Sequence, residues 1–314
     1  MNPTDPSPDT LTTAGDGRSV LRMERRLDRP PGRVWEALTR PAPLARWFPA
    51  EVSVEPRPGG RIGFTFPGEA GPGTTGTVTD AREPALFAFT WGEDLLRFDL
   101  APDGEGSLLT LTHTFGDRYG AASYAAGWQL CLAALARLLD DDGRPEPEPE
   151  PGAGAGAGTK SAGAGTESPG AGPERDTGGA LHESYIARFG LEQGVVETTA
   201  DGWRIRVERQ LVRPAQTVWA ELRAHSTPLL GGPAPRGFTI PESPPGRITA
   251  LRPPHLLAYA TAGGGEVRWQ LAEGTGHGPR LILTQTGPPF TPPEPVLAAW
   301  QGRVARLAAR LSAL

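Results

Sequence analysis

Hydrophobic and polar positions follow the same order in two stretches of the chain. Residues 20–27 alternate between apolar and polar side chains, which predicts a strand with one buried face. Pro30 then stands where a helix can begin, because proline has a fixed φ and no N–H to satisfy. Val34 and Leu38 follow at helical spacing. Residues 206–222 show the same succession, so we predict a strand and a helix in both places.

The two stretches are copies of one another. Nine positions of Arg22–Leu38 are identical, without a gap, in Arg206–Leu222. Later blocks match in the same order: Arg97–Leu100 with Arg268–Leu271, Leu111–Thr114 with Leu283–Thr286, and Trp128-Gln129 with Trp300-Gln301. Similarity that keeps its order over this length indicates an internal duplication.

The remaining pattern of the first copy predicts an α+β fold. We expect a short helical segment at 41–48, strands at 51–55, 61–66, 75–81, 85–91, 95–101 and 108–115, and a long helix at 119–139. The connections are too short for crossovers, so the strands should pair antiparallel. The buried face of such a sheet needs a cover, and the long helix is the element able to provide it.

Composition divides the chain between the copies. Alternating Pro and Glu, followed by Gly-Ala repeats, favour a flexible linker. We predict a disordered N-terminus at 1–18, a first domain at 19–142, a linker at 143–180 and a second domain at 181–314. The second copy has no counterpart of Trp47-Phe48 and is shorter by one or two strands, so we expect a degenerate domain.

Charge and apolar content exclude several classes of function. The net charge is −5 and no basic block stands out, which argues against a nucleic-acid partner. The single cysteine, Cys131, excludes an internal disulfide and a cysteine-rich zinc site. No apolar run reaches the roughly 18 residues of a membrane span, and the polar N-terminus lacks a signal-peptide pattern. We therefore expect a cytoplasmic protein.

Several motifs of the first copy together resemble a known family. They are Leu27-x-x-Pro30-x-x-x-Val34-Trp35-x-x-Leu38-Thr39, Trp47-Phe48, Gly59-Gly60, Gly76-x-Val78, Leu109-x-Leu111-Thr112-His113 and Gly127-Trp128. Residues 19–140 are similar to the activator of heat-shock protein 90 ATPase homologue family of the SRPBCC (START-like) superfamily. The resemblance implies two tandem helix-grip domains, each with a curved antiparallel sheet wrapped around a long C-terminal helix and an apolar cavity. It fixes the fold far better than the function.

A second resemblance bears on the domain boundary. Residues 182–191 are similar to the tail that follows the last helix in bacterial relatives of this family. If they belong to that tail, the second domain begins near residue 195 rather than at 181.

Aromatic side chains of the first copy are the candidate lining of the implied cavity. The predicted ligand-binding residues are Trp47, Phe48, Phe64, Phe66, Phe89, Trp91, Leu111, His113, Tyr124 and Trp128. Most of these side chains would also serve as core, because the walls of such a cavity are the inner surface of the core.

His113 is the one candidate for acid–base chemistry. It shares a strand face with Leu109, Leu111 and Phe115, so it points into the cavity if that face is concave. There it could orient a ligand carbonyl or exchange a proton. The second copy has Gln285 at this position, and no carboxylate is placed to orient the ring. We therefore assign no catalytic residue.

Other reactive side chains have simpler interpretations. Cys131 lies among apolar neighbours of the last helix and is expected to be a small buried hydrophobe. The run Asp140–Asp142 is expected to be a solvated helix end rather than a metal site. Glu24, Arg25 and Arg26 should form cross-strand ion pairs with Arg97 and Asp99 on the exposed face. No motif for a cofactor, a metal or a nucleophile is present in the sequence.

Three hypotheses of function follow. The leading one is non-enzymatic binding of a small apolar or amphipathic ligand in the cavity of the first domain. The second is a co-chaperone-like or regulatory module that binds a chaperone or another protein, which rests on the family resemblance. The third is an enzyme similar to polyketide cyclases or dehydratases, with His113 as acid or base.

Overall fold

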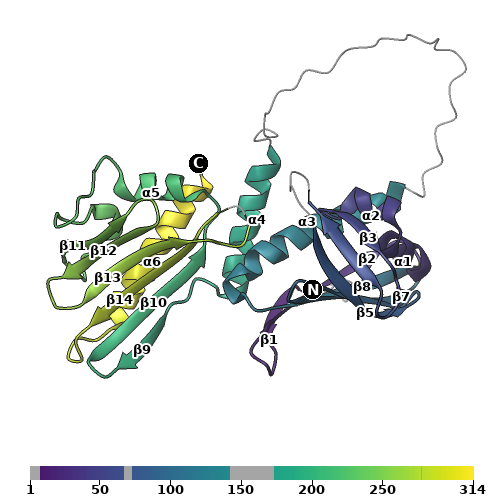
Figure 1. Cartoon of the computed structure of the whole chain (residues 1–314), viewed down its shortest axis with the longest axis horizontal. Coiled ribbons are helices and arrows are strands. Elements are labelled where there is room, and N and C mark those ends of the chain that lie inside the picture. Colours follow the sequence, from purple (N-terminus) through teal and green to yellow (C-terminus); the bar gives the residue numbers. More distant parts are fainter. Residues whose placement is uncertain (1–7, 67–72, 142–172, 277) are drawn as a thin grey trace, which may run out of the picture. The chain divides into compact units, whose positions relative to one another are not determined.

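The computed structural model describes residues 8–66, 73–141, 173–276 and 278–314, with the backbone alone at 173–178. The chain forms two compact units. We name the domains by their sheets: the first domain has strands β1–β8 and the second has strands β9–β14 (Figure 1). No helix among the described residues is long and apolar enough to cross a bilayer.

The first domain has eight described strands in one sheet, ordered β1-β2-β8-β7-β6-β5-β4-β3. Its elements are β1 Thr10–Thr13, β2 Ser19–Leu27, α1 Pro31–Thr39, α2 Pro41–Trp47, β3 Glu51–Val54, β4 Arg61–Thr65, β5 Thr74–Arg82, β6 Leu86–Trp91, β7 Asp94–Asp103, β8 Gly106–Phe115, η1 Arg118–Gly120 and α3 Ala121–Asp141. Neighbouring strands from β3 to β8 pair antiparallel.

The second domain has six described strands, ordered β11-β12-β13-β14-β10-β9. Its elements are α4 Pro173–Phe189, β9 Val195–Thr199, β10 Gly202–Gln210, α5 Ala215–Arg223, η2 Arg236–Phe238, β11 Pro245–Arg252, β12 Leu256–Thr261, β13 Glu266–Ala272, β14 Arg280–Gly287 and α6 Glu294–Ser312. Helix α6 lies along this sheet in Figure 1. No described element corresponds to α2, β3 or β4, in line with the shorter second copy.

The predicted fold class is confirmed: both domains are α+β, with an antiparallel sheet and a long C-terminal helix. Strand β8 shows why the sequence pattern predicted the strands. Its buried positions alternate strictly, and Leu109, Leu111, His113 and Phe115 all face the interior. Because successive strand residues point to opposite faces, one buried face leaves a period of two in the sequence.

Two expectations about irregular segments need correction. Strand β1 lies within residues 1–18, which we expected to be disordered; it pairs with β2, and the preceding Asp9 is buried. Helix α4 begins within the expected linker. The Pro-Glu and Gly-Ala repeats themselves fall in 142–172, outside the described residues. A short strand gains its hydrogen bonds from a neighbour, so four residues alone did not reveal it.

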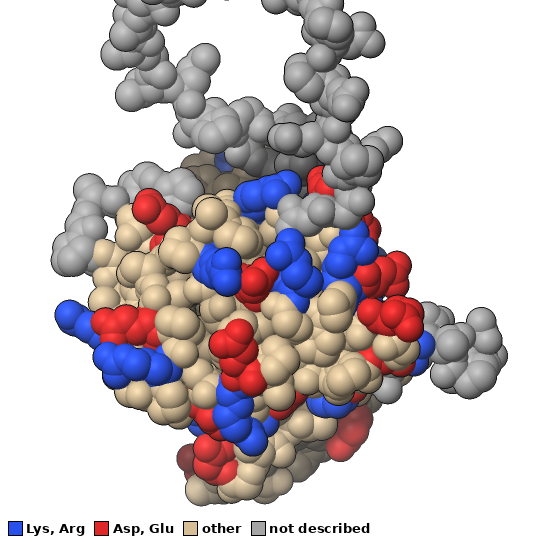
Figure 2. All heavy atoms as spheres, turned by 90° about the vertical axis from the view of Figure 1, so that its right-hand side faces the viewer, with Lys and Arg blue, Asp and Glu red and all other residues tan. Residues whose placement is uncertain are grey.

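The exposed face of the first sheet carries ion pairs, as expected, but with different partners. Arg97 binds Asp99 on the same strand through hydrogen bonds of 2.7 and 2.6 Å. Arg25 is not part of this face: its guanidinium binds the buried Asp9 at 2.8 Å and the side chain of Gln129. Over the face drawn in Figure 2, acidic and basic side chains lie interspersed.

Candidate ligand site of the first domain

Aromatic rings of the first domain form one continuous cluster. Phe48 caps the C-terminus of α2, and its ring centroid lies 5.8 Å from that of Phe64, 5.7 Å from Trp91 and 5.9 Å from Trp128. Phe64 and Trp91 stack at 4.7 Å. The end of α2 is thereby joined to strands β4 and β6 and to helix α3. Such ring contacts add about 0.5–1.5 kcal/mol each beyond the burial of their area.

A small void of about 10 Å³ lies within this cluster. Its lining consists of Leu38, Leu44, Trp47, Phe48, Val52, Ile62, Phe64, Phe87, Phe89 and Phe98. The indole N–H of Trp47, the polar group among these side chains, donates to the Ala37 carbonyl at 2.9 Å. A void of this size holds about one water, and an apolar void stays dry. A ligand can therefore enter only if part of the wall moves.

A chain of hydrogen bonds crosses the interior beside the cluster. The indole N–H of Trp128 donates to His113 Nδ1 at 3.2 Å, and His113 Nε2 lies 3.0 Å from Asp94 Oδ2. Because an indole N–H can only donate, Nδ1 is the acceptor, and the neutral ring carries its proton on Nε2, toward the carboxylate. The expectation that no carboxylate orients His113 was wrong. Asp94 begins β7, and pairing with β8 brings it there.

The second domain repeats this chain with different side chains. Trp300 donates to Gln285 Oε1 at 2.5 Å, and Gln285 Nε2 donates to Ser243 Oγ at 2.9 Å. Trp300 and Gln285 occupy the positions of Trp128 and His113 in the repeat. In both domains a tryptophan of the closing helix is therefore tethered to the same place on the sheet. A tether shared by His and Gln does not depend on proton transfer.

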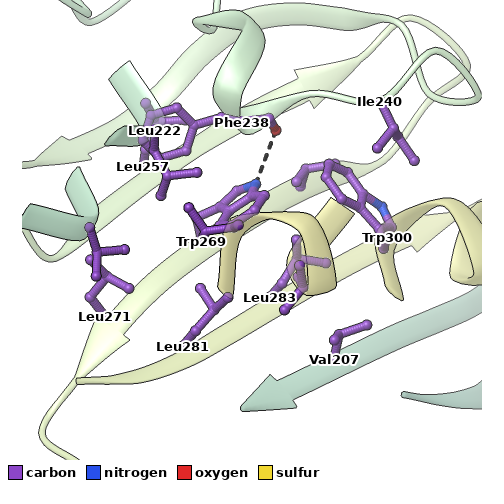
Figure 3. Packing of buried hydrophobic residues seen from close by; sticks show 14 of the residues in the cluster. Val207, Leu222, Phe238, Ile240, Leu257, Trp269, Leu271, Leu281, Leu283 and Trp300 are labelled. Atoms are coloured by element: carbon purple, nitrogen blue, oxygen red, sulfur yellow. Dashed lines mark hydrogen bonds between the residues drawn. The ribbon is translucent and has the colours of Figure 1, made fainter. Parts of the chain in front are cut away.

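The aromatic side chains at two buried positions of the sheet differ between the domains. Tyr259 and Trp269 occupy the positions of Phe89 and Phe98, and both donate to the Phe238 carbonyl, at 2.9 and 3.0 Å. Figure 3 shows the bond from Trp269. Burial raises the pKa of Tyr259, so its hydroxyl stays protonated and able to donate. The second core is thus closed by hydrogen bonds at the level where the first has a void.

The structure brings most of the predicted site residues together. The void is lined by Trp47, Phe48, Phe64 and Phe89, and Phe48 is contacted by Trp91 and Trp128. The ring of Phe66 stacks on Trp91 at 5.6 Å. On β8, Leu111 and His113 are buried, whereas Tyr124 on α3 is half-buried and lies outside the lining. Their role in binding stays a prediction.

Sequence reasoning missed several lining residues. They are Leu38, Leu44, Val52, Ile62, Phe87 and Phe98. The alternation of β7, where Leu96, Phe98 and Leu100 are buried, would have identified Phe98.

Neither of the other reactive groups forms a site. Cys131 is half-buried in α3, and burial raises the pKa of its thiol to about 11, which keeps it protonated at neutral pH. Asp140 and Asp141 are exposed at the end of α3, and Asp142 lies outside the described residues. Within the described parts of the chain, no three His, Cys, Asp or Glu side chains are grouped to hold a metal ion.

Known proteins match this chain as follows. The family described as Activator of Hsp90 ATPase homolog 1-like protein matches residues 28–140. The crystal structure of CalU16 from Micromonospora echinospora is similar, with 22% identity, 44% of this chain and 87% of that chain covered, and a TM-score of 0.36. The solution NMR structure of the same protein is 22% identical, with 60% of this chain and 97% of that chain covered and a TM-score of 0.41. A conserved protein of unknown function from Enterococcus faecalis is 21% identical, with 57% of this chain and 89% of that chain covered and a TM-score of 0.41. No curated protein matches the chain.

Proposed function

We propose, from the membership of residues 28–140 in the family of activator of Hsp90 ATPase homolog 1-like proteins, that the first domain binds a small apolar or amphipathic ligand. The void lined by the aromatic cluster is the place of binding. The observation that carries the proposal is the all-apolar lining of this void, at a level where the second domain is closed by hydrogen bonds.

Chemistry of the lining sets the class of ligand. The inner side chains are aliphatic or aromatic, and the one indole N–H among them is already bonded to Ala37. A polar ligand would lose its hydrogen bonds to water without replacement, at a cost of roughly 2–7 kcal/mol per group. An apolar ligand gains about 25 cal/mol for each Å² it buries. The site therefore favours apolar ligands, with any polar group directed outward.

Entry requires the wall at α2 to move. Helix α2 has only seven residues, Pro41–Trp47, and the exposed fraction of Phe48 at its end is 8%. The Phe48 side chain forms no hydrogen bond, and its ring is held by contacts with other aromatic rings. Displacing this ring while Trp47 keeps its hydrogen bond to Ala37 therefore breaks packing contacts only. The closed arrangement is then one member of an equilibrium, and a ligand shifts the population toward the open one.

The test uses 1-aminoanthracene, a neutral fluorescent probe, with the full chain. We expect saturable binding and a rise in the Tm of the first domain. Val52→Ile adds one methylene group to the void and should weaken binding at least fivefold, whereas Leu44→Ala enlarges the void and should strengthen it. Val196→Ile on the exposed strand β9 is the matched control and should change nothing.

Absence of saturable binding in both wild type and Leu44→Ala would overturn the proposal. So would equal binding by wild type and Val52→Ile, because the probe would then occupy another place.

Acid–base catalysis by His113 has less support. Both ring nitrogens are engaged, one by the Trp128 indole and the other by the Asp94 carboxylate. Neither is available to a substrate unless the tether of α3 is broken. The co-chaperone hypothesis has the family's description behind it and no further feature of the described residues.

A further inference from the structure

A polar trough of about 560 Å³ lies on the outer face of the second sheet. It is lined by Glu197, Arg204, Arg206, Glu266, Arg268, Thr284 and Thr286. The threonines belong to β14, with β13 on one side and β10 on the other. Thr284 is in register with Arg268 of β13 and with Arg206 of β10. Short hydroxyl side chains therefore form the floor, and long charged ones form the two walls.

The outer face of the first sheet has a charge partner that this face lacks. Arg268 corresponds to Arg97, because each is in register with a threonine of the next strand. Arg97 binds the Asp99 carboxylate, but the second domain has Gln270 at the position of Asp99. Arg268 consequently forms no ion pair with any described residue. A guanidinium that forms no ion pair beside an open trough can form charge-assisted hydrogen bonds to an anionic group.

This face also has a second arginine that the first domain lacks at the corresponding position. Arg204 stands where the first domain has Val20, and it too forms no ion pair within the described parts of the chain. Arg206, in contrast, is compensated by the Glu208 carboxylate. The trough therefore offers two guanidinium groups, Arg204 and Arg268, that form no ion pair with a described residue.

Carboxylates occupy the adjacent row of the trough. Glu266 lies two residues before Arg268 on β13, about 6.8 Å away along the strand. It accepts a hydrogen bond from the Thr249 hydroxyl at 2.9 Å but forms no ion pair with a described residue. Glu197 is in register with Arg204. A polyanion such as nucleic acid would be repelled by these carboxylates, whereas a molecule that carries both signs is matched by the trough.

We propose that this trough binds a small zwitterion, with its carboxylate at Arg268 and Thr284 and its ammonium group at Glu266. A guanidinium and a carboxylate form two parallel hydrogen bonds, and the threonine hydroxyl donates a third. The site is independent of the void in the first domain, since all its residues belong to the sheet of the second domain.

Titration of the full chain with 6-aminohexanoate tests this proposal, because the charges of that probe are separated by a chain of suitable length. Hexanoate and hexylamine are the single-charge controls. We expect saturable binding of 6-aminohexanoate, measured by calorimetry at low salt, and at least tenfold weaker binding of both controls. Arg268→Gln should weaken binding at least tenfold, while Arg97→Gln on the corresponding face of the first domain should leave it unchanged.

Other outcomes would overturn the proposal. Equal binding of hexanoate and 6-aminohexanoate would show a general attraction of anions. Unchanged binding in Arg268→Gln, in protein with wild-type Tm, would place the probe elsewhere. No saturable binding at millimolar probe would show that the trough is a solvated surface.

Discussion

At the same two positions of the sheet, the first domain has Phe89 and Phe98, and the second has Tyr259 and Trp269. Both pairs are buried, and one ring of each pair, Phe98 or Trp269, contacts the tryptophan of the closing helix. The second pair donates hydrogen bonds to the carbonyl of Phe238, while the first pair surrounds a void with no hydrogen bond of its own. Duplication thus produced two cores with the same topology and different means of closure.

This difference teaches where a ligand can enter such a fold. Breaking the Phe238 carbonyl bonds exposes a buried acceptor without a partner, at about 1–3 kcal/mol, besides the lost packing. Moving the Phe48 ring, which is held by contacts between aromatic rings, has no such added cost. The second core is therefore expected to be rigid and the first adaptable.

The largest effect should come from making the second core like the first. The double variant Tyr259→Phe, Trp269→Phe removes both donors to Phe238 and shrinks one ring. We expect a loss of about 3–5 kcal/mol in the stability of the second domain, from the unpaired carbonyl and the new cavity. Hydrogen exchange of strands β12 and β13 measures it, with the strands of the first domain as internal control.

A variant without loss of protection in β12 and β13 would contradict a hydrogen-bonded closure. If protection falls and 1-aminoanthracene then binds a second time, the difference between the domains rests on these two donors.

Substitution of His113, which holds Trp128 of α3, should reduce the stability of the first domain by an intermediate amount that depends on the new side chain. His113→Leu leaves the Trp128 indole N–H buried without an acceptor and should destabilise the first domain by about 1–3 kcal/mol. His113→Gln should cost less than about 1 kcal/mol, because Gln285 forms the same links in the second domain. Denaturant unfolding compares the two variants. Equal losses for Leu and Gln would show that the two chains of hydrogen bonds are not equivalent.

How far the sequence predicted these features depends on how local their causes are. The strands and the closing helices could be predicted because alternation and helical spacing are local patterns of the sequence. These patterns do not depend on which strands become neighbours in the sheet. The role of Asp94 did not follow, because only the register of Leu96 with His113 places it beside the ring. The size of the void was also beyond prediction. It depends on how ten side chains from six elements pack, and the sequence names the residues without their rotamers.

Two arginines at the same position of the repeats, Arg25 and Arg209, give a comparison that depends on pH. Arg25 binds Asp9, and its counterpart Arg209 binds Glu183 of α4. Burial alone would raise the pKa of Glu183, but His182 and the Arg209 guanidinium together hold it below its usual value. A carboxyl with a lowered folded pKa stabilises the protein above its unfolded pKa of about 4.3, and this contribution is lost as the pH falls through the folded pKa.

We therefore expect Glu183→Gln to destabilise the second domain at pH 7 by about 1 kcal/mol, since Glu183 is partly exposed to solvent. The difference from wild type should disappear toward pH 3. Urea unfolding at pH 7, 5 and 3, followed through the second domain, measures it. A difference that stays constant with pH would show that the substitution acts through packing rather than charge.

The smallest effect tests the void directly. Val52→Ile adds one methylene where the first core has room, and we expect a gain of about 0.8 kcal/mol in the stability of that domain. The same methylene at Val267, which is fully buried in the second core, has no void to enter and should destabilise the second domain. Thermal unfolding of the two variants therefore gives shifts of opposite sign. Two losses would mean that the first core is as closed as the second, and the contrast between the domains would rest on hydrogen bonds alone.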